Sequence, residues 1–224
     1  MKPYFQDESV TIYHGDCRDV LPTLGKVDLV LTDPPYGIGD SANQSTDSRG
    51  DRTGNRAGGA NTWHLPSEWD AELTLPDFGD GQLIAWFGHW RKRTDVEAKY
   101  GRARCEIIWA KDTHVGPPCP AAMRDERMWV FGPSFIPRRF ETTVWDVPII
   151  PTWSHRHHKN EKPVGLLKRA LLWLPGETIL DPFMGSGTTL RAAKDLNRKA
   201  IGIEIEERYC EIAAKRMSQL AMNL

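Results

Sequence analysis

The chain has 224 residues, of which 40% are hydrophobic and 26% charged, and its formal net charge is -1. This length suffices for one well-buried domain, and the near-neutral charge neither requires nor excludes a nucleic-acid partner. No apolar run approaches membrane-spanning length, the N-terminus has no apolar signal core, and the four cysteines include no Cys-x-x-Cys pair. We therefore expect a cytoplasmic protein with reduced thiols, and neither a zinc ribbon nor a disulfide framework.

The amino-terminal part of the chain predicts two strands joined by a helix. Val10–Tyr13 is a short apolar strand, Arg18–Leu24 has a helical pattern, and Val27–Asp33 is a continuous apolar run typical of a strand buried on both faces. Pro34 and Pro35 follow at once and cannot continue a central strand. We therefore expect Asp33 to lie at the carboxyl end of a buried strand.

Ile38–Asn61 differs in kind, because it has almost no apolar residues and is rich in Gly, Ser, Asn and Arg. Such a segment cannot form a core, and a loop of this length inside a compact domain is usually a lid or a binding element. We predict a mobile polar loop here.

The rest of the chain alternates strand and helix patterns, with a connection of little periodicity over Pro133–Asn160. Strands are predicted over Gln82–Gly88, Cys105–Lys111, Arg127–Gly132, Thr178–Phe183 and Lys199–Ile205, and helices over Arg91–Tyr100, Lys162–Leu174, Thr188–Asn197 and Glu207–Leu220. Such alternation predicts an α/β fold with a doubly wound, mostly parallel sheet. We expect residues 1–224 to form a single domain.

Asp33-Pro34-Pro35-Tyr36 is the first of two motifs that indicate chemistry. Open α/β sheets bind ligands at the carboxyl ends of their strands. The amino group of an aromatic base is a poor nucleophile because its lone pair is delocalised into the ring, and acceptors for its hydrogens favour a tetrahedral nitrogen. Asp33 and the Pro34 carbonyl supply two such acceptors on a turn that the prolines stiffen, and Tyr36 offers a flat face to an extruded base.

The second motif, Asp181–Thr189, is a glycine-rich turn between a predicted strand and a helix. Glycines let a backbone approach a ligand closely, and a helix N-terminus favours a negative group such as a carboxylate. The turn has neither the Gly-Lys-Ser/Thr of a P-loop nor a Gly-x-Gly-x-x-Gly pattern. Glu204, at the end of the next strand, is suited to ribose hydroxyls, although it could also be a solvated strand-end residue.

Six segments resemble the DNA amino-methyltransferases of the β class, in which the catalytic motif precedes the cofactor motif. They are Gly15–Cys17, Thr32–Gly37, Ile107–Lys111, His158–Leu167, Leu180–Thr189 and Ile201–Ile205. The resemblance implies a Rossmann-like fold of the class I methyltransferase type with circularly permuted motif order, S-adenosylmethionine as cofactor and DNA as substrate. Members with Asp at the position of Asp33 usually methylate adenine at N6, whereas those with Ser usually methylate cytosine at N4.

The same resemblance assigns roles to individual residues. The catalytic residues are Asp33, Pro34, Pro35 and Tyr36. The residues implied to bind S-adenosylmethionine are Asp16, Cys17, Asp33, Lys162, Asp181, Phe183, Gly185, Ser186, Gly187, Thr188 and Glu204. Asp16 has a second interpretation, as the cap of the helix that follows it.

The chain departs from the family's pattern in two places. His158-Lys159-Asn160-Glu161-Lys162-Pro163 stands where His-Pro-Thr-Gln/Glu-Lys-Pro is usual, which weakens the assignment of His158 more than that of Lys162. The family also inserts a substantial target-recognition region before this segment, whereas here only Pro133–His157 is available. Either this piece reads DNA with help from the Ile38–Asn61 loop, or sequence selectivity is low. We expect a short or degenerate recognition site.

Basic residues in and around these two segments are the candidates for contact with double-stranded DNA. Those after Pro133 combine charge with aromatic neighbours, which suits phosphate binding and base stacking, and those of the polar loop are candidates because of its flexibility and reach. They are Arg49, Arg52, Arg56, Arg138, Arg139, Arg156 and Lys159. A solvated surface is the alternative interpretation for each. His155, His157 and His158 have no evident carboxylate or cysteine ligands beside them, so we expect no metal site.

The predicted function is transfer of a methyl group from S-adenosylmethionine to the N6 amine of adenine in DNA, by a monomer or a homodimer that does not bind membranes. Methylation of the N4 amine of cytosine stays open, as does an RNA or protein-glutamine substrate, since all present a planar nitrogen. A cofactor-binding but inactive DNA-binding subunit is a further alternative. The intact Asp33 and the intact glycine turn speak against it.

Overall fold

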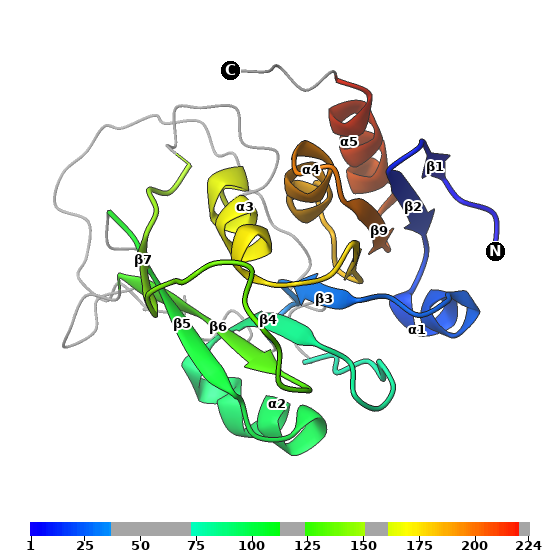
Figure 1. The fold of residues 1–224 in the computed structure, drawn as a ribbon. Coiled ribbons are helices and arrows are strands. Elements are labelled where there is room, and N and C mark those ends of the chain that lie inside the picture. The colour runs from blue at the N-terminus through cyan, green and yellow to red at the C-terminus, as the bar shows by residue number, and fades with distance from the viewer. Residues whose placement is uncertain (37–72, 113–123, 151–160, 220–224) are drawn as a thin grey trace, which may run out of the picture.

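The computed structural model describes residues 1–36, 73–112, 124–150 and 161–219 (Figure 1). These residues form a nine-stranded sheet in the order β1-β2-β9-β8-β3-β4-β6-β5-β7. The strands are β1 (Phe5–Gln6), β2 (Val10–His14), β3 (Leu29–Thr32), β4 (Ile84–Gly88), β5 (Cys105–Ala110), β6 (Asp125–Phe131), β7 (Val144–Asp146), β8 (Thr178–Asp181) and β9 (Lys199–Glu204). The predicted loop over Ile38–Asn61 lies outside the described residues.

Parallel pairing dominates the sheet and is continuous from β2 through β9, β8 and β3 to β4. Within the second half of the sheet, β6 runs in the opposite direction, because it pairs antiparallel with both β4 and β5. The predicted doubly wound, mostly parallel sheet is therefore confirmed. The antiparallel direction of β6 brings its amino end, rather than its carboxyl end, to the edge where β3 and β4 finish.

Helices cover both faces of the sheet (Figure 1). The helices α3 (Val164–Trp173), α4 (Thr188–Asp195) and α5 (Glu207–Ser218) lie on one face, whereas α1 (Cys17–Val20) and α2 (Arg93–Tyr100) lie on the other. Short 3₁₀ helices extend the second group, at Leu21–Thr23 after α1 and at Trp90–Lys92 before α2. In the described part of the chain, no helix is long and apolar enough to cross a membrane.

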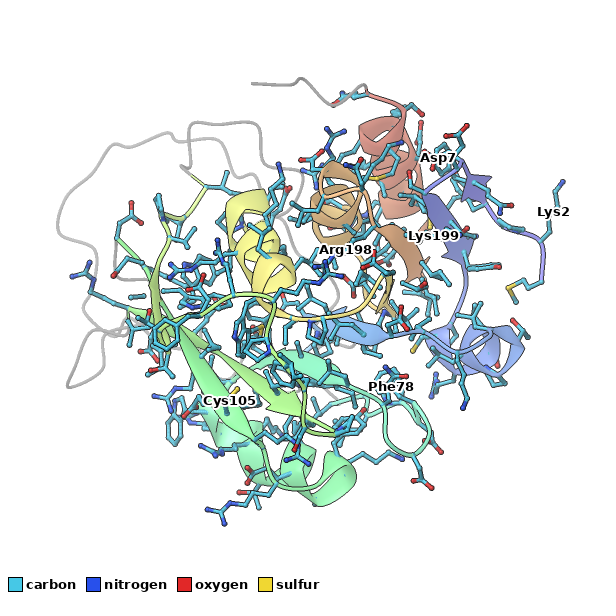
Figure 2. All side chains as sticks on the ribbon, viewed as in Figure 1. Lys2, Asp7, Phe78, Cys105, Arg198 and Lys199 are labelled. Atoms are coloured by element: carbon cyan, nitrogen blue, oxygen red, sulfur yellow. The ribbon has the colours of Figure 1, made fainter. Side chains whose placement is uncertain are left out.

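The core is split in two by the sheet because alternate side chains of a strand point to opposite faces. In β3, Leu29 and Leu31 pack on the side of α3 and α4, whereas Val30 packs with Val20 and Val96 on the side of α1 and α2. Figure 2 shows the side chains that fill the space between these layers. A strand buried on both faces needs a continuous apolar run, which is how its sequence is recognised.

The sheet has a topological switch point between β8 and β3. From β3 the chain moves outward to its neighbour β4, and from β8 it moves in the other direction, through α4, to its neighbour β9. Ligands of open α/β sheets bind in the crevice outside the carboxyl ends of the strands at such a point. The residues that follow β3 and β8 are Asp33 and Pro182, within the two motifs.

Three features of the fold differ from the predicted elements. β1 and β7 were not predicted, because two or three residues are too few to show a period. β6 begins at Asp125, two residues before the predicted start, so the acidic residues Asp125 and Glu126 belong to the strand. Among the described residues, no group of three or more His, Cys, Asp or Glu side chains could hold a metal ion.

Candidate active site

The first half of the site is the turn after β3. All four residues of β3 are buried, and the strand stops at Pro34 and Pro35, which lack the N–H that a sheet requires. The Thr32 hydroxyl donates a buried hydrogen bond of 2.8 Å to Oδ1 of Asp181, at the end of β8. This bond ties the two strand ends together, so both motifs lie at one edge of the sheet.

The second half is the glycine turn between β8 and α4. Asp181 accepts a further hydrogen bond from the Phe183 N–H, and the Gly185 N–H donates to Oε2 of Glu204 over 3.0 Å. Glu204 ends β9 and also accepts from the N–H of Glu206. The acidic residue predicted one strand later is thus in direct contact with the turn.

Two glycines of the turn have left-handed backbone conformations, with φ of 50° at Gly185 and 79° at Gly187. They differ in surroundings. A Cβ added at Gly187 would lie 2.8 Å from Cβ of Ala213 in α5, whereas one at Gly185 would meet nothing within 4 Å. Gly187 therefore permits helix packing, and Gly185 borders open space at the switch point.

The carboxyl groups of Asp181 and Glu204 have raised pKa values. Burial raises the pKa of Asp181 to about 6, although hydrogen bonds from Thr189 and Thr32 oppose this rise. Burial likewise raises the pKa of Glu204 to about 7, against the two backbone N–H groups that favour its charge. A carboxylate that is kept buried beside a glycine turn is suited to accept hydrogen bonds from an uncharged, hydroxyl-bearing ligand.

Asp33 lies in a cluster of charged side chains. The Tyr36 hydroxyl donates to Asp33 Oδ1 over 2.9 Å, and the Lys162 ammonium forms an ion pair with Asp33 Oδ2. Lys162 also lies 3.1 Å from Oε2 of Glu126, whose other oxygen forms an ion pair with Lys111. Two carboxylates and two ammonium groups therefore neutralise one another around the end of β3.

Burial and neighbouring charges set the protonation of this cluster. Burial raises the pKa of Asp33; the Lys162 charge opposes that rise and the Glu126 charge adds to it. Burial also opposes the charge of Glu126, but Lys162 and Lys111 outweigh it and lower the Glu126 pKa to about 2. For Lys162, burial is outweighed by the two carboxylates, so its pKa is raised. Burial first, then the charge of Asp33, raises the pKa of Tyr36 well above its usual value.

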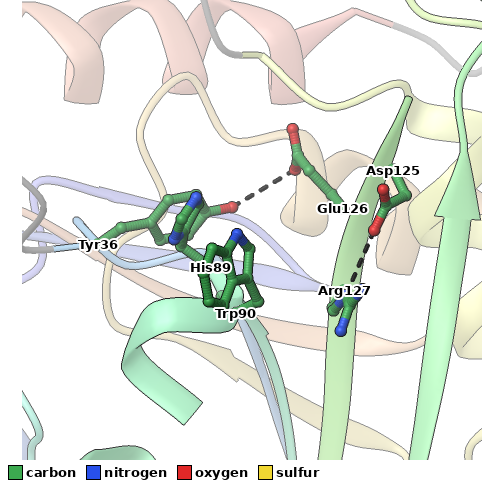
Figure 3. A pocket seen from close by; sticks show the side chains of 7 residues that line it. Tyr36, His89, Trp90, Asp125, Glu126 and Arg127 are labelled. Carbon is green, nitrogen blue, oxygen red and sulfur yellow. Dashed lines mark hydrogen bonds and ion pairs between the residues drawn. The ribbon is translucent and has the colours of Figure 1, made fainter. Parts of the chain in front are cut away.

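A pocket adjoins the ring of Tyr36 on the β4 and β6 side (Figure 3). It is lined by Tyr36, Gly88, His89, Trp90, Asp125, Glu126 and Arg127. The His89 ring is tilted against the Tyr36 ring with centroids 6.4 Å apart, and the Trp90 side chain is exposed. Along the sheet edge the order is therefore glycine turn, Asp33, aromatic pocket.

This geometry agrees with comparisons of the chain with known proteins. Residues 83–215, more than half of the chain, match the family model for DNA methylases of the N6/N4 type. The chain belongs to this family. It is 43% identical to the type II methyltransferase M.HinfI of Haemophilus influenzae, over the whole of this chain and 72% of that protein.

Solved structures of low sequence identity share the fold. The M1.HpyAVI complex with S-adenosylmethionine aligns over 92% of this chain and 99% of that one, at 21% identity and a TM-score of 0.63. The cytosine-N4-specific PvuII DNA methyltransferase aligns over all of this chain and 90% of that one, at 15% identity and a TM-score of 0.67. The family resemblance and the class I methyltransferase fold are confirmed, and the methyl donor of this DNA methylase is S-adenosylmethionine.

The described residues fit that cofactor on two observations of this structure. The space in front of Gly185 is open, as a bound methionine chain would require, and Glu204 presents a half-buried carboxylate beside it, as ribose hydroxyls would require. Asp16 follows β2 at the same edge and caps α1 by accepting from the Arg18 N–H. The capping role is therefore present, and it does not exclude the predicted contact with the cofactor. Cys17 is buried, and burial raises the pKa of its thiol to about 11.

Glu161 and Lys162 connect the two halves of the site in this methylase. Lys162 was predicted to bind the cofactor, but its ammonium contacts Asp33 and Glu126. Its neighbour Glu161 forms a buried ion pair with Arg216 of α5. The same guanidinium donates to the Ser186 carbonyl over 3.0 Å and to the Thr188 hydroxyl over 3.0 Å. Of these two consecutive residues, Lys162 contacts the Asp33 carboxylate and Glu161 contacts the glycine turn through Arg216.

The predicted DNA contacts are only partly described. Arg138 forms an ion pair with Glu177, directly before β8, and thus lies at the edge of the sheet opposite to Asp181. Arg139 forms an ion pair with Glu141. The structure does not bring these two arginines to the catalytic site. The other predicted DNA contacts, Arg49, Arg52, Arg56, Arg156 and Lys159, lie outside the described residues, as do His155, His157 and His158.

Glu126 is the site residue that sequence reasoning missed. It precedes the apolar run of β6, so a strand drawn from Arg127 onward leaves it in a connection. The available signal was the acidic pair Asp125-Glu126 directly in front of a predicted strand. In an antiparallel pair, the beginning of one strand meets the end of the other.

Proposed function

We propose that the chain methylates the N6 amine of adenine in double-stranded DNA. The observation that carries this proposal is the Asp33 carboxylate at the switch point, between the glycine turn and the aromatic pocket. Family resemblance supports adenine over cytosine, because Asp rather than Ser stands at the first position of the catalytic motif. The neighbouring rings of Tyr36, His89 and Trp90 are suited to stack on a base that has left the duplex.

In the proposed reaction each half of the site has one task. S-adenosylmethionine, when bound, supplies a methyl group on a positively charged sulfur that leaves as a neutral thioether. Glu204 accepts hydrogen bonds from the ribose hydroxyls of the cofactor, and the open space beside Gly185 admits the methionine part of the cofactor. Aromatic side chains beside Asp33, among them Tyr36 and the exposed Trp90, stack on the flipped adenine, whose extrusion costs a few kcal/mol.

Asp33 and the Pro34 carbonyl then accept hydrogen bonds from the adenine amine. These contacts orient the nitrogen and favour the tetrahedral form on which its lone pair is free. The two prolines hold both acceptors in place before the base arrives, so little reorganisation is needed during the reaction. Because Asp33 accepts a hydrogen bond from the amine, it is also positioned to receive the proton that the methylated amine must lose.

Recognition of the DNA sequence is assigned to two segments outside the site described above. We propose that the segment over Pro133–His157 and the loop over Ile38–Asn61 contact the duplex, and that the recognition site is short or degenerate. The chain offers only a short connection where larger members of the family carry a recognition region. Low selectivity is therefore expected.

The decisive experiment identifies the modified base. Unmethylated DNA is incubated with the protein and methyl-labelled cofactor, digested to nucleosides and separated. We expect the label in N6-methyldeoxyadenosine. Label in N4-methyldeoxycytidine would replace the adenine proposal with the cytosine alternative, and no label on any DNA would favour the inactive-subunit alternative.

A further inference from the structure

Both oxygens of the Asp33 carboxylate already have partners. The Tyr36 hydroxyl donates to Oδ1, and the Lys162 ammonium forms an ion pair with Oδ2. Each partner uses acceptor capacity that the target amine needs, and an ion pair with a buried ammonium weakens a carboxylate as an acceptor. A carboxylate has about four acceptor sites, so these two donors leave only part of it to the target amine. A second place for both donors would leave the whole Asp33 carboxylate to that amine.

Glu126 offers that second place. Its Oε2 lies 3.1 Å from Nζ of Lys162 and 3.4 Å from the Tyr36 hydroxyl, so each donor stands between two carboxylates. The ion pair with Lys111 holds the other oxygen of Glu126 from the end of β5. Figure 3 shows the Glu126 side chain extending from β6 toward the Tyr36 hydroxyl at the rim of the pocket.

We propose that Glu126 is a positioning residue for methyl transfer, which takes up the Lys162 ammonium and the Tyr36 hydroxyl and so leaves the Asp33 carboxylate free to accept the target amine. The proposal rests on the proposed function only in assigning the amine to Asp33. Glu126 acts through Lys162 and Tyr36, and the role involves no covalent step. It applies equally to an adenine or a cytosine amine.

The charges around Asp33 make this role measurable. The groups that face Asp33 are Lys162 before α3, Glu126 of β6, Tyr36 of the same turn and Asp181 of β8. The charge of Asp33 contributes to the raised pKa of Asp181. The Lys162 charge lowers the Asp33 pKa and the Glu126 charge raises it, on top of the rise caused by burial. Loss of the Glu126 charge should therefore lower the Asp33 pKa, whereas loss of the Lys162 charge should raise it.

The first test is independent of activity. Protein labelled with ¹³C at the aspartate carboxyl groups is titrated by NMR, and the Asp33 signal is identified by its absence in Asp33→Asn. We expect a lower Asp33 pKa in Glu126→Gln, a higher one in Lys162→Met, and no change in Glu211→Gln, a matched control on the exposed side of α5. An Asp33 pKa in Glu126→Gln equal to or above that of the wild type overturns the proposal.

The second test measures the rate of methyl transfer in a single turnover with saturating S-adenosylmethionine. Glu126→Gln is expected to lower this rate by about tenfold or more, the loss expected for one charged hydrogen bond, with the cofactor Kd unchanged within about twofold. A wild-type rate in this variant contradicts the proposal. The identity of the methylated nucleoside tests the proposed function separately, because its failure leaves the Asp33 titration as a valid test of Glu126.

Discussion

Alanine substitutions at the two left-handed glycines of the turn should separate cofactor binding from folding. A left-handed backbone costs a residue other than glycine about 1–2 kcal/mol, so Gly185→Ala should lose about that much free energy of unfolding. Gly187→Ala carries the same backbone cost, and its Cβ would also lie 2.8 Å from Cβ of Ala213. Overpacking of this kind costs about 1–3 kcal/mol more. The expected total for Gly187→Ala is about 2–5 kcal/mol.

The effect on cofactor affinity should be in the opposite order. The new methyl group at Gly185 projects into the open space at the switch point, where the account places the methionine part of the cofactor. We expect at least about tenfold weaker binding of S-adenosylmethionine, which corresponds to ~1.4 kcal/mol. At Gly187 the new methyl group points into the α5 interface instead, so folded protein should lose less affinity.

Two measurements on each variant check these values. Urea unfolding, followed by the fluorescence of the nine tryptophans, gives the free energy of unfolding, and isothermal titration calorimetry gives the cofactor Kd. Wild-type affinity in Gly185→Ala would show that the cofactor does not lie against this turn. Equal stability of the two variants would show that the contact with Ala213 is absent in solution.

Three further predictions concern the residues that join the two halves of the site. Thr32→Val removes the buried hydrogen bond to Asp181 and should lower the free energy of unfolding by about 1–3 kcal/mol; an unchanged urea midpoint would argue against the bond. Burial raises the Glu204 pKa to about 7, and ribose hydroxyls bind the ionised carboxylate better than the protonated one. Cofactor affinity, measured by calorimetry, should therefore increase from pH 6 to pH 8 in the wild type and change less in Glu204→Gln. Equal pH profiles of the two proteins would refute this role of Glu204. Arg216→Met removes the cation from the buried carboxylate of Glu161 and should cost about 3–5 kcal/mol in urea unfolding, and a loss below 1 kcal/mol would contradict a buried pair.

The mostly parallel sheet and the position of both motifs could be predicted from sequence because they follow local rules. An unbroken apolar run ending in Pro34-Pro35 specifies a buried strand and its last residue, and a glycine turn followed by a helical pattern specifies the second strand end. Parallel strands place their carboxyl ends at one edge, so Asp33 and Asp181 were expected together. The Thr32–Asp181 hydrogen bond bears this out.

The rest of the site depends on contacts between residues far apart in the chain. Glu126 joins Asp33 only because β6 runs antiparallel to β4, and the direction of a strand is not encoded in its own apolar pattern. Lys162 contacts the carboxylates of Asp33 and Glu126, which belong to other parts of the sheet. The sequence around Lys162 gives no sign of these contacts. Arg216 lies in an ordinary amphipathic helix, and only the packing of α5 against the glycine turn gives it a role.

Single-turnover methyl transfer by Asp33→Ala, together with its cofactor affinity, tests the central role of the carboxylate at the end of β3. We predict that Asp33→Ala binds S-adenosylmethionine with nearly wild-type affinity. Its rate of methyl transfer to DNA should fall by about 10²–10³-fold or more, as expected when a preorganised polar group is removed from a reacting centre. Asp80→Ala, at an exposed position, serves as the matched control and should transfer at the wild-type rate. Transfer by Asp33→Ala at a rate near that of the control would contradict the account.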